Sequence, residues 1–175
     1  MTTISALNGT EVLARAEGLA ELLTDSVHGG ASIGFLAPLE RSEAVAWWRA
    51  RAAAVEAGAL TVWVAHEGAR VTGTVGLALP DKANSRHRAE LVKLMVHREA
   101  RGRGLGRRLL ATAERGAAAA GITLLHLDTE TGSPAEVLYG SVGWTRVGAI
   151  PDYAATPAGV LHPTTVFYKH VGDSR

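Results

Sequence analysis

The residues with the clearest chemical potential lie between positions 93 and 112, in the stretch KLMVHREARGRGLGRRLLAT. An apolar run over 94–96 leads into an arginine- and glycine-rich turn over 101–106, and apolar residues then resume at helical spacing. We interpret this as a strand, a glycine-rich turn and the start of a helix. Backbone N–H groups at a helix N-terminus attract anions, and flanking arginines bind further phosphate oxygens. The stretch therefore predicts a phosphate or pyrophosphate site.

The turn lacks the two commonest phosphate-loop patterns. No Gly-x4-Gly-Lys-Ser/Thr run is present, and a dinucleotide fingerprint needs a glycine where Leu109 stands. What remains is Arg-x-x-Gly-x-Gly, filled by Arg101, Gly104 and Gly106. From this pattern alone, a plain surface turn or a basic patch for nucleic acid stays open.

Composition limits the classes of protein to consider. The chain has 175 residues, of which 47% are hydrophobic and 20% charged, and its net charge is +1. This predicts one soluble globular domain over 1–175 and argues against a general polyanion binder. The absence of cysteine excludes disulfides, thiolate metal sites and a cysteine nucleophile. The first residues lack a secretory signal and no apolar run is long enough for a membrane helix, so we expect a cytoplasmic protein without a membrane or metal partner.

The elements that must position the turn follow from periodicity and from helix caps. Predicted helices cover 10–27, the segment after Pro38 up to Gly58, 105–120 and 133–142, and predicted strands cover 61–65, 71–79, 88–97, 122–129, 144–150 and 164–171. Thr10 and Ser133 are the predicted N-caps, and residues 151–163 are expected to be irregular. This order predicts an α/β (α+β) fold, a mixed sheet with helices on both faces.

A second motif follows the turn at the right distance. Ala135, Tyr139, Gly143 and Trp144 stand about 30 residues after it, with a predicted strand between. With the Arg-x-x-Gly-x-Gly turn, this resembles the GNAT superfamily of N-acetyltransferases. The family often has asparagine at the position of Gly132. The resemblance implies a mostly antiparallel central sheet in which a splayed pair of strands, 90–97 and 122–129, holds acetyl-CoA.

Three further segments narrow the resemblance. Residues 28–35 (HGGASIGF), 124–131 (LLHLDTET) and 153–163 (YAATPAGVLHP) are similar to the tabtoxin-resistance acetyltransferase subgroup. That subgroup acetylates the amino group of a β-lactam amino-acid toxin. The resemblance implies acetyl transfer to the amine of a small molecule, with antibiotic resistance as a role. Acceptor pockets diverge faster than folds, so the particular toxin is implied less strongly than the reaction.

The resemblance also carries the cofactor contacts, residue by residue. It implies acetyl-CoA as co-substrate and no metal. The predicted cofactor-binding residues are Met95, Val96, Arg101, Gly102, Arg103, Gly104, Leu105, Gly106, Arg107, Ala135 and Tyr139.

Direct transfer needs a deprotonated amine and a proton for the leaving thiolate. Tyr139 matches the family tyrosine beside the sulfur, and we assign it as general acid. Glu90 and Asp128 are the acidic residues on the two central, otherwise apolar strands, so either is the candidate that holds the ammonium or receives its proton. His126 is a reserve base. The competing structural roles are a packed core tyrosine, carboxylates capped by backbone or arginine, and a core histidine.

The acceptor site is expected at the mouth of the strand pair. Its predicted substrate-binding residues are His28, Ser32, Phe35, Glu90, Asp128 and Tyr153. Asp152 and His162 belong to the late segment that could cover the same mouth. For all loop members, a role in loop structure is the competing interpretation. The strand pattern over 166–168 also suggests a homodimer, by packing or by sheet extension.

A serine hydrolase is a rival to the acetyltransferase hypothesis. Residues 30–34 match Gly-x-Ser-x-Gly, and Asp128 and His162 follow in hydrolase order. A nucleophile elbow must follow a strand, however, and a helix is predicted before Ser32. Two further classes stay open at the level of sequence, a protein or peptide N-acetyltransferase and a non-catalytic acetyl-CoA-binding module.

Overall fold

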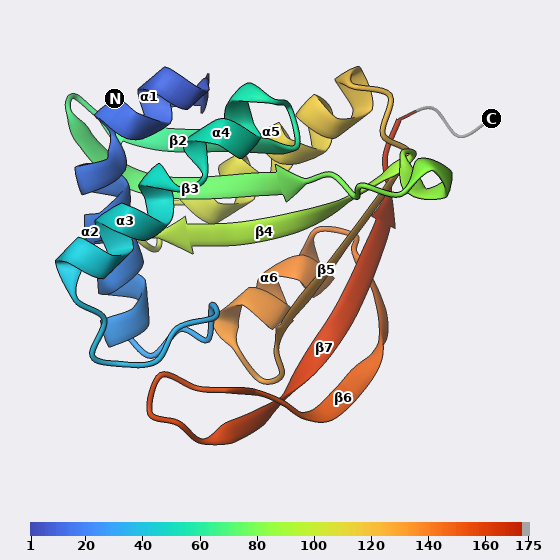
Figure 1. Ribbon diagram of the computed structural model, residues 1–175. Helices are drawn as coiled ribbons and strands as arrows, with labels where there is room; N and C mark the ends of the chain where they lie inside the picture. The colour runs from blue at the N-terminus through green and yellow to red at the C-terminus, as the bar shows by residue number, and fades with distance from the viewer. Residues whose placement is uncertain (173–175) are drawn as a thin grey trace.

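The computed structural model describes residues 1–172, and a seven-stranded sheet in the order β1-β2-β3-β4-β5-β7-β6 runs through them (Figure 1). In chain order, the strands are β1 Thr3–Leu7, β2 Leu60–Glu67, β3 Arg70–Ala78, β4 Arg88–Val96, β5 Leu124–Glu130, β6 Thr145–Ala155 and β7 Leu161–His170. Every neighbouring pair is antiparallel except β4 and β5. The predicted mixed, mostly antiparallel sheet is confirmed.

Helices cover both faces of this sheet (Figure 1). They are α1 Gly9–Ala14, α2 Ala16–His28, α3 Arg41–Arg49, α4 Ala52–Glu56, α5 Leu105–Ala119 and α6 Pro134–Ser141, with single 3₁₀ turns η1 at Ala83–Ser85 and η2 at Arg98–Ala100. Because strand side chains alternate between faces, Val62 and Val64 of β2 join the core under α1 to α4, while Ala65 joins the core under α5. No helix of this described part has the length and hydropathy needed to cross a membrane.

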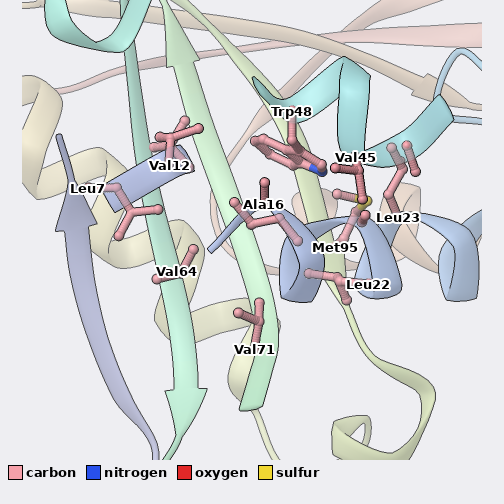
Figure 2. Close-up of a cluster of buried hydrophobic side chains, with 14 of the residues drawn as sticks. Leu7, Val12, Ala16, Leu22, Leu23, Val45, Trp48, Val64, Val71 and Met95 are labelled. Atoms are coloured by element: carbon pink, nitrogen blue, oxygen red, sulfur yellow. The ribbon is translucent and has the colours of Figure 1, made fainter. Parts of the chain in front are cut away.

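The first core is built around Trp48 of α3, which is only 2% exposed. Figure 2 shows its ring among Val45, Ala16 and Met95, so that α2 and α3 are joined to β4 through one apolar cluster. Met95 therefore connects this core to the strand that leads into the arginine- and glycine-rich turn.

The second core packs α5 against β2, β3, β4 and β5. Leu109, Leu110 and Ala113 are almost fully buried on one face of the helix, as the alanine-rich periodicity predicts. On the same helix, a Cβ on Gly116 would overlap the ring of Trp63. The helix thus lies close to the sheet, and this fixes the position of its N-terminus.

The parallel pair β4 and β5 is joined only at one end. Residues 88–90 pair with residues 124–126, and beyond them the two strands diverge (Figure 1). The predicted splayed pair is therefore present. On the other side of β4 the register with β3 shifts between Thr74 and Gly76, which marks a bulge in β4. Lys93 lies in this bulge with φ +52.

The N-terminal part differs from the prediction in three ways. Strand β1 was not predicted, and it pairs with β2 at the edge of the sheet. The helix predicted over 10–27 is broken at Arg15, and its N-cap is Asn8 rather than Thr10. Asn8 accepts from the Glu11 N–H while the Glu11 carboxylate accepts from the Asn8 N–H, so the cap is satisfied in both directions.

The late segment 151–163 is irregular only over residues 156–160. Strands β6 and β7 form a long hairpin that continues through it with a register shift between Ile150 and Ala154. Strand β7 lies between β5 and β6, so sheet extension through residues 166–168 is wrong. The edge of the sheet on this side is β6, where Val147 and Tyr153 are exposed. A homodimer, by packing, stays a prediction.

Candidate active site

The turn before α5 forms the floor of the site. Gly102 and Gly104 have φ of +75 and +72, a backbone region that favours glycine. Gly104 is the N-cap of α5 and offers no side chain to the first turn, so the N–H groups of Leu105, Gly106 and Arg107 are left for a ligand. A Cβ on Gly102 or Gly104 would meet no atom within 4 Å. This open, donor-rich turn fits a diphosphate.

Arginine side chains border the same turn. Arg101 Nε donates to the Val96 carbonyl at 3.1 Å, and Arg107 Nη2 donates to Ser141 Oγ at 2.9 Å. The side chain of Arg103 is exposed. Within residues 1–172, none of the three lies within 4 Å of a carboxylate. Their positive charge is thus available to an anion at the turn.

A buried carboxylate holds the approach to the turn in place. Asp25 of α2 has a side chain only 8% exposed, and it accepts from the Arg98 backbone N–H at 3.0 Å and from Arg98 Nε. His97 Nε2 lies 3.8 Å from Asp25 Oδ1. Burial acts to raise the pKa of Asp25, but the Arg98 hydrogen bonds and the charges of His97 and Arg98 outweigh it, and the pKa is lowered.

The substitution Asp25→Asn should therefore destabilise the fold at neutral pH by about 1–3 kcal/mol, the cost of a lost charge-assisted contact. A carboxylate with a lowered pKa stabilises the fold above its unfolded pKa, and that stabilisation is lost as pH falls through the folded pKa. The stability difference between wild type and variant should be largest at pH 7 and shrink below about pH 4. Urea unfolding across this range measures it, and a difference that grows on acidification would contradict the assignment.

The slot opens where β5 leaves β4. Met95 is 3% exposed and Val96 is half-buried, and both pair with β3 on one side while β5 has diverged on the other. The backbone edge of β4 past Glu90 thus has no strand partner on the β5 side. This is the geometry expected for a ligand that lies between the strands, and the pantetheine contacts of Met95 and Val96 stay predictions.

Tyr139 lies on α6, whose start is fixed as predicted by Ser133 as N-cap and Pro134 at the first position. Its side chain is 5% exposed, and its ring centroid lies 5.7 Å from that of Trp144 and 5.9 Å from that of Phe167. Burial, helped by the negative charge of Asp128, raises the pKa of Tyr139, so the phenol keeps its proton. Ala135 is half-buried and packs against the same core, and Gly132 lies in the preceding turn with φ +81.

The acidic candidates lie on the two diverging strands. Glu90 of β4 is half-buried and pairs in register with His126 of β5. Asp128, two residues further along β5, is exposed, and its Oδ2 accepts from Thr164 Oγ1 at 2.9 Å. His126 Nε2 lies 2.9 Å from an Arg88 Nη1. Because Arg88 occupies this ring nitrogen, His126 is the weaker base candidate.

The loop residues predicted to bind the acceptor are used in different ways. His28 Nε2 accepts from the Leu39 N–H at 3.3 Å, and Ser32 Oγ donates to the Ala155 carbonyl at 3.4 Å. Both contacts support loop structure. Phe35 instead packs edge-on against Trp47, with centroids 5.4 Å apart, and Tyr153 is 51% exposed on β6.

The loop after α2 and the tip of the β6–β7 hairpin touch each other. Besides the Ser32 contact, the Ala37 N–H donates to the Pro157 carbonyl at 2.8 Å. A shallow hollow of about 520 Å³ lies at this junction, and its lining includes His28, Pro38 and Thr156 but neither Tyr139 nor Glu90. The hollow therefore includes the predicted acceptor residue His28 but not the predicted catalytic residues Tyr139 and Glu90.

The structure does not have the arrangement of Ser32, Asp128 and His162 that a serine hydrolase needs. Ser32 follows helix α2 rather than a strand, and its hydroxyl is bonded to a backbone carbonyl. His162 Nδ1 lies 2.7 Å from Glu130, while Asp128 is bonded to Thr164. The three residues of that motif have separate partners. In the part of the chain that the structure describes, no cluster of three or more potential metal ligands occurs.

Two cationic residues at the mouth were not predicted. Lys93 and Arg51 both approach Trp47, with Lys93 Nζ 5.5 Å and Arg51 Cζ 3.3 Å from its ring centroid. A lysine within the otherwise apolar run of residues 91–96 was the available signal for Lys93. No sequence pattern indicated Arg51.

Comparison with known proteins agrees with this geometry. A family model described as "Acetyltransferase (GNAT) domain" matches residues 58–146, which is just over half of the chain and includes β4, the turn, α5, β5 and α6.

Solved structures extend the likeness over the whole fold. YncA from Salmonella typhimurium, solved with its cofactor acetyl-CoA, superposes with a TM-score of 0.79 at 22% identity over 100% of this chain and 96% of that one. A ribosomal-protein-alanine N-acetyltransferase from Brucella melitensis gives 0.77 at 22% identity, over 97% of this chain and 99% of that one. An N-acetyltransferase from Staphylococcus aureus Mu50 gives 0.79 at 14% identity, over 97% and 98%. At these identities the structures bear on the fold, and the family match bears on the activity. The chain belongs to the GNAT acetyltransferase family and is an enzyme that transfers an acetyl group from acetyl-CoA.

Proposed function

We propose that this enzyme acetylates the amine of a small, amino-acid-like molecule, as the resemblance to the tabtoxin-resistance subgroup implies. The observation that carries the proposal is Tyr139, a buried phenol that keeps its proton and whose pKa is raised in part by the negative charge of Asp128. Asp128 lies on β5, the strand that diverges from β4 beyond Glu90. In this proposal, a proton donor and two carboxylates border one slot. A cationic amine is the acceptor that such carboxylates favour.

The proposed reaction is direct attack in a ternary complex. Glu90 or Asp128 takes one proton from the ammonium, and the freed nitrogen attacks the thioester carbonyl carbon. A C–N bond forms, the C–S bond breaks, and Tyr139 gives its proton to the leaving sulfur. The attacking nitrogen then loses its second proton, which restores the Tyr139 phenol and leaves the neutral amide. When bound, acetyl-CoA supplies the activated acetyl group. The turn at Gly102 and Gly104 and the first amides of α5 would hold its diphosphate.

The test is release of free thiol from acetyl-CoA in the presence of single amines. The panel should contain L-amino acids, phosphinothricin, polyamines and an N-terminal alanine peptide. Saturable thiol release with an amino-acid-like compound, and the acetylated product by mass spectrometry, is the expected result. Faster turnover of the peptide would favour protein acetylation, an activity that the name of the Brucella melitensis neighbour carries. CoA binding without turnover of any amine would favour a non-catalytic module.

A further inference from the structure

Lys93 occupies an unusual place in β4. It lies in the bulge with φ +52, a backbone region that residues other than glycine adopt at a cost of about 1 kcal/mol. The bulge turns its side chain toward the loop after α2, where Nζ donates to the Ile33 carbonyl at 2.7 Å. The rings of Phe35 and Trp47 lie 5.8 Å and 5.5 Å from Nζ. A strained backbone that presents a long cationic side chain marks a functional position.

Arg51 adds a second positive charge at the same wall. Its guanidinium stacks over Trp47 at 3.3 Å, and Nη1 donates to the Trp47 carbonyl at 2.7 Å. Among residues 1–172, neither Lys93 nor Arg51 has a carboxylate within 4 Å. Two half-buried cations beside each other without a counter-ion are destabilised by desolvation and mutual repulsion.

The pKa of Lys93 reflects the same excess of positive charge. Burial, and then the charge of Arg51, lowers its pKa, and the charges of Glu90 and Asp128 offset only part of this. These carboxylates, from β4 and β5, act on Lys93 through their charge, so negative and positive groups occur together near the slot. An acceptor with an ammonium and an anionic group would complement both.

We propose that Lys93, supported by Arg51, binds a carboxylate of the acceptor and thereby selects amines that carry one. The inference rests on the proposed function, because it assigns the second group of the same acceptor. In the bound state, one or both of the Lys93 N–H groups not used by Ile33 would donate to the carboxylate. Lys93 is then a specificity residue, while Glu90 or Asp128 handles the amine.

The competing role for Lys93 is structural, since its bond to Ile33 also anchors the loop. Matched acceptors separate the two roles. L-Phenylalanine with phenethylamine, and L-lysine with cadaverine, differ by one carboxylate. If Lys93 only anchors the loop, its loss should weaken both members of a pair equally.

Steady-state kinetics should be measured for wild type, Lys93→Met, Lys93→Arg and the exposed-loop control Lys82→Met. Loss of a charge-assisted contact predicts that Lys93→Met raises KM for the carboxylate member by roughly 10- to 100-fold. Its kcat, and the KM of the decarboxylated member, should change less than about threefold. Lys93→Arg should recover part of the loss, and Lys82→Met should match wild type. Equal effects on both members overturn the proposal.

A binding measurement keeps this inference separate from the proposed reaction. Trace acetylation of lysines by acetic anhydride, followed by peptide mass spectrometry, reports the accessibility of Lys93, with exposed Lys82 as internal reference. The L-amino acids should protect Lys93 and the decarboxylated amines should not, whether or not either is turned over. Protection without turnover would sink the proposed acetylation and keep the carboxylate site. Turnover of amino acids without protection of Lys93 would support the proposed acetylation and overturn the carboxylate site.

Discussion

The substitution Tyr139→Phe is expected to lower kcat by about 10²- to 10³-fold, the usual contribution of a positioned general acid. Burial holds the pKa of Tyr139 above its ordinary value, so the phenol is protonated at neutral pH. It is therefore in the protonated form that a general acid requires. Phenylalanine removes only the hydroxyl and leaves the ring packed against Trp144 and Phe167.

Thiol release under saturating acetyl-CoA measures this loss. The matched measurements are the Kd for CoA by calorimetry and the Tm, and both should stay near wild type because ring packing and the diphosphate turn are unchanged. A kcat within twofold of wild type would assign protonation of the sulfur to water and make Tyr139 a packing residue. A parallel fall in Tm and kcat would mean that the hydroxyl supports the packing of α6, and Tyr139 would then be a structural residue.

Local signals were sufficient for much of this fold. The periodicity of α5 and the Ser133-Pro134 start of α6 are properties of a few neighbouring residues, and the structure has both elements. The divergence of β4 from β5 came from the family resemblance rather than from periodicity. It is visible in the structure as pairing that stops after Glu90.

The missed features depend on pairing between distant segments. Strand β1 is five residues long, and its partner β2 lies more than 50 residues away. The strand predicted over 144–150 continues to Ala155 as β6, and its exposed residues show no alternation of apolar side chains that would mark this continuation. The bulge that turns Lys93 toward Trp47 arises from the register of β4 against β3. None of these is encoded within a short window of sequence, which is why the acceptor wall was predicted less completely than the diphosphate turn.

The substitution Gly106→Ala tests the diphosphate turn, because it should keep or raise the stability of the fold while it weakens the binding of CoA. The added Cβ would lie 3.4 Å from Leu138 Cδ2 and 3.9 Å from Val96 Cγ2, which is ordinary contact. Alanine is favoured over glycine inside a helix by about 0.5–1 kcal/mol, so the Tm should stay level or rise. If the first amides of α5 hold the diphosphate, however, a phosphate oxygen must come close to the Gly106 N–H. A methyl group on this residue should then hinder that approach and raise the Kd for CoA by roughly 10- to 100-fold.

Gly140→Ala is the matched control for this experiment. Gly140 lies in α6 with no atom within 4 Å of an added Cβ, so alanine there should raise stability in the same way without touching the turn. Calorimetric titration of CoA into the three proteins should therefore separate them, with weak binding only in Gly106→Ala. Because both substitutions favour their helices, a difference in CoA affinity cannot come from unfolding. Equal affinity in all three proteins would mean that the diphosphate is held elsewhere, and the slot between β4 and β5 would lose its role as the path of the thioester.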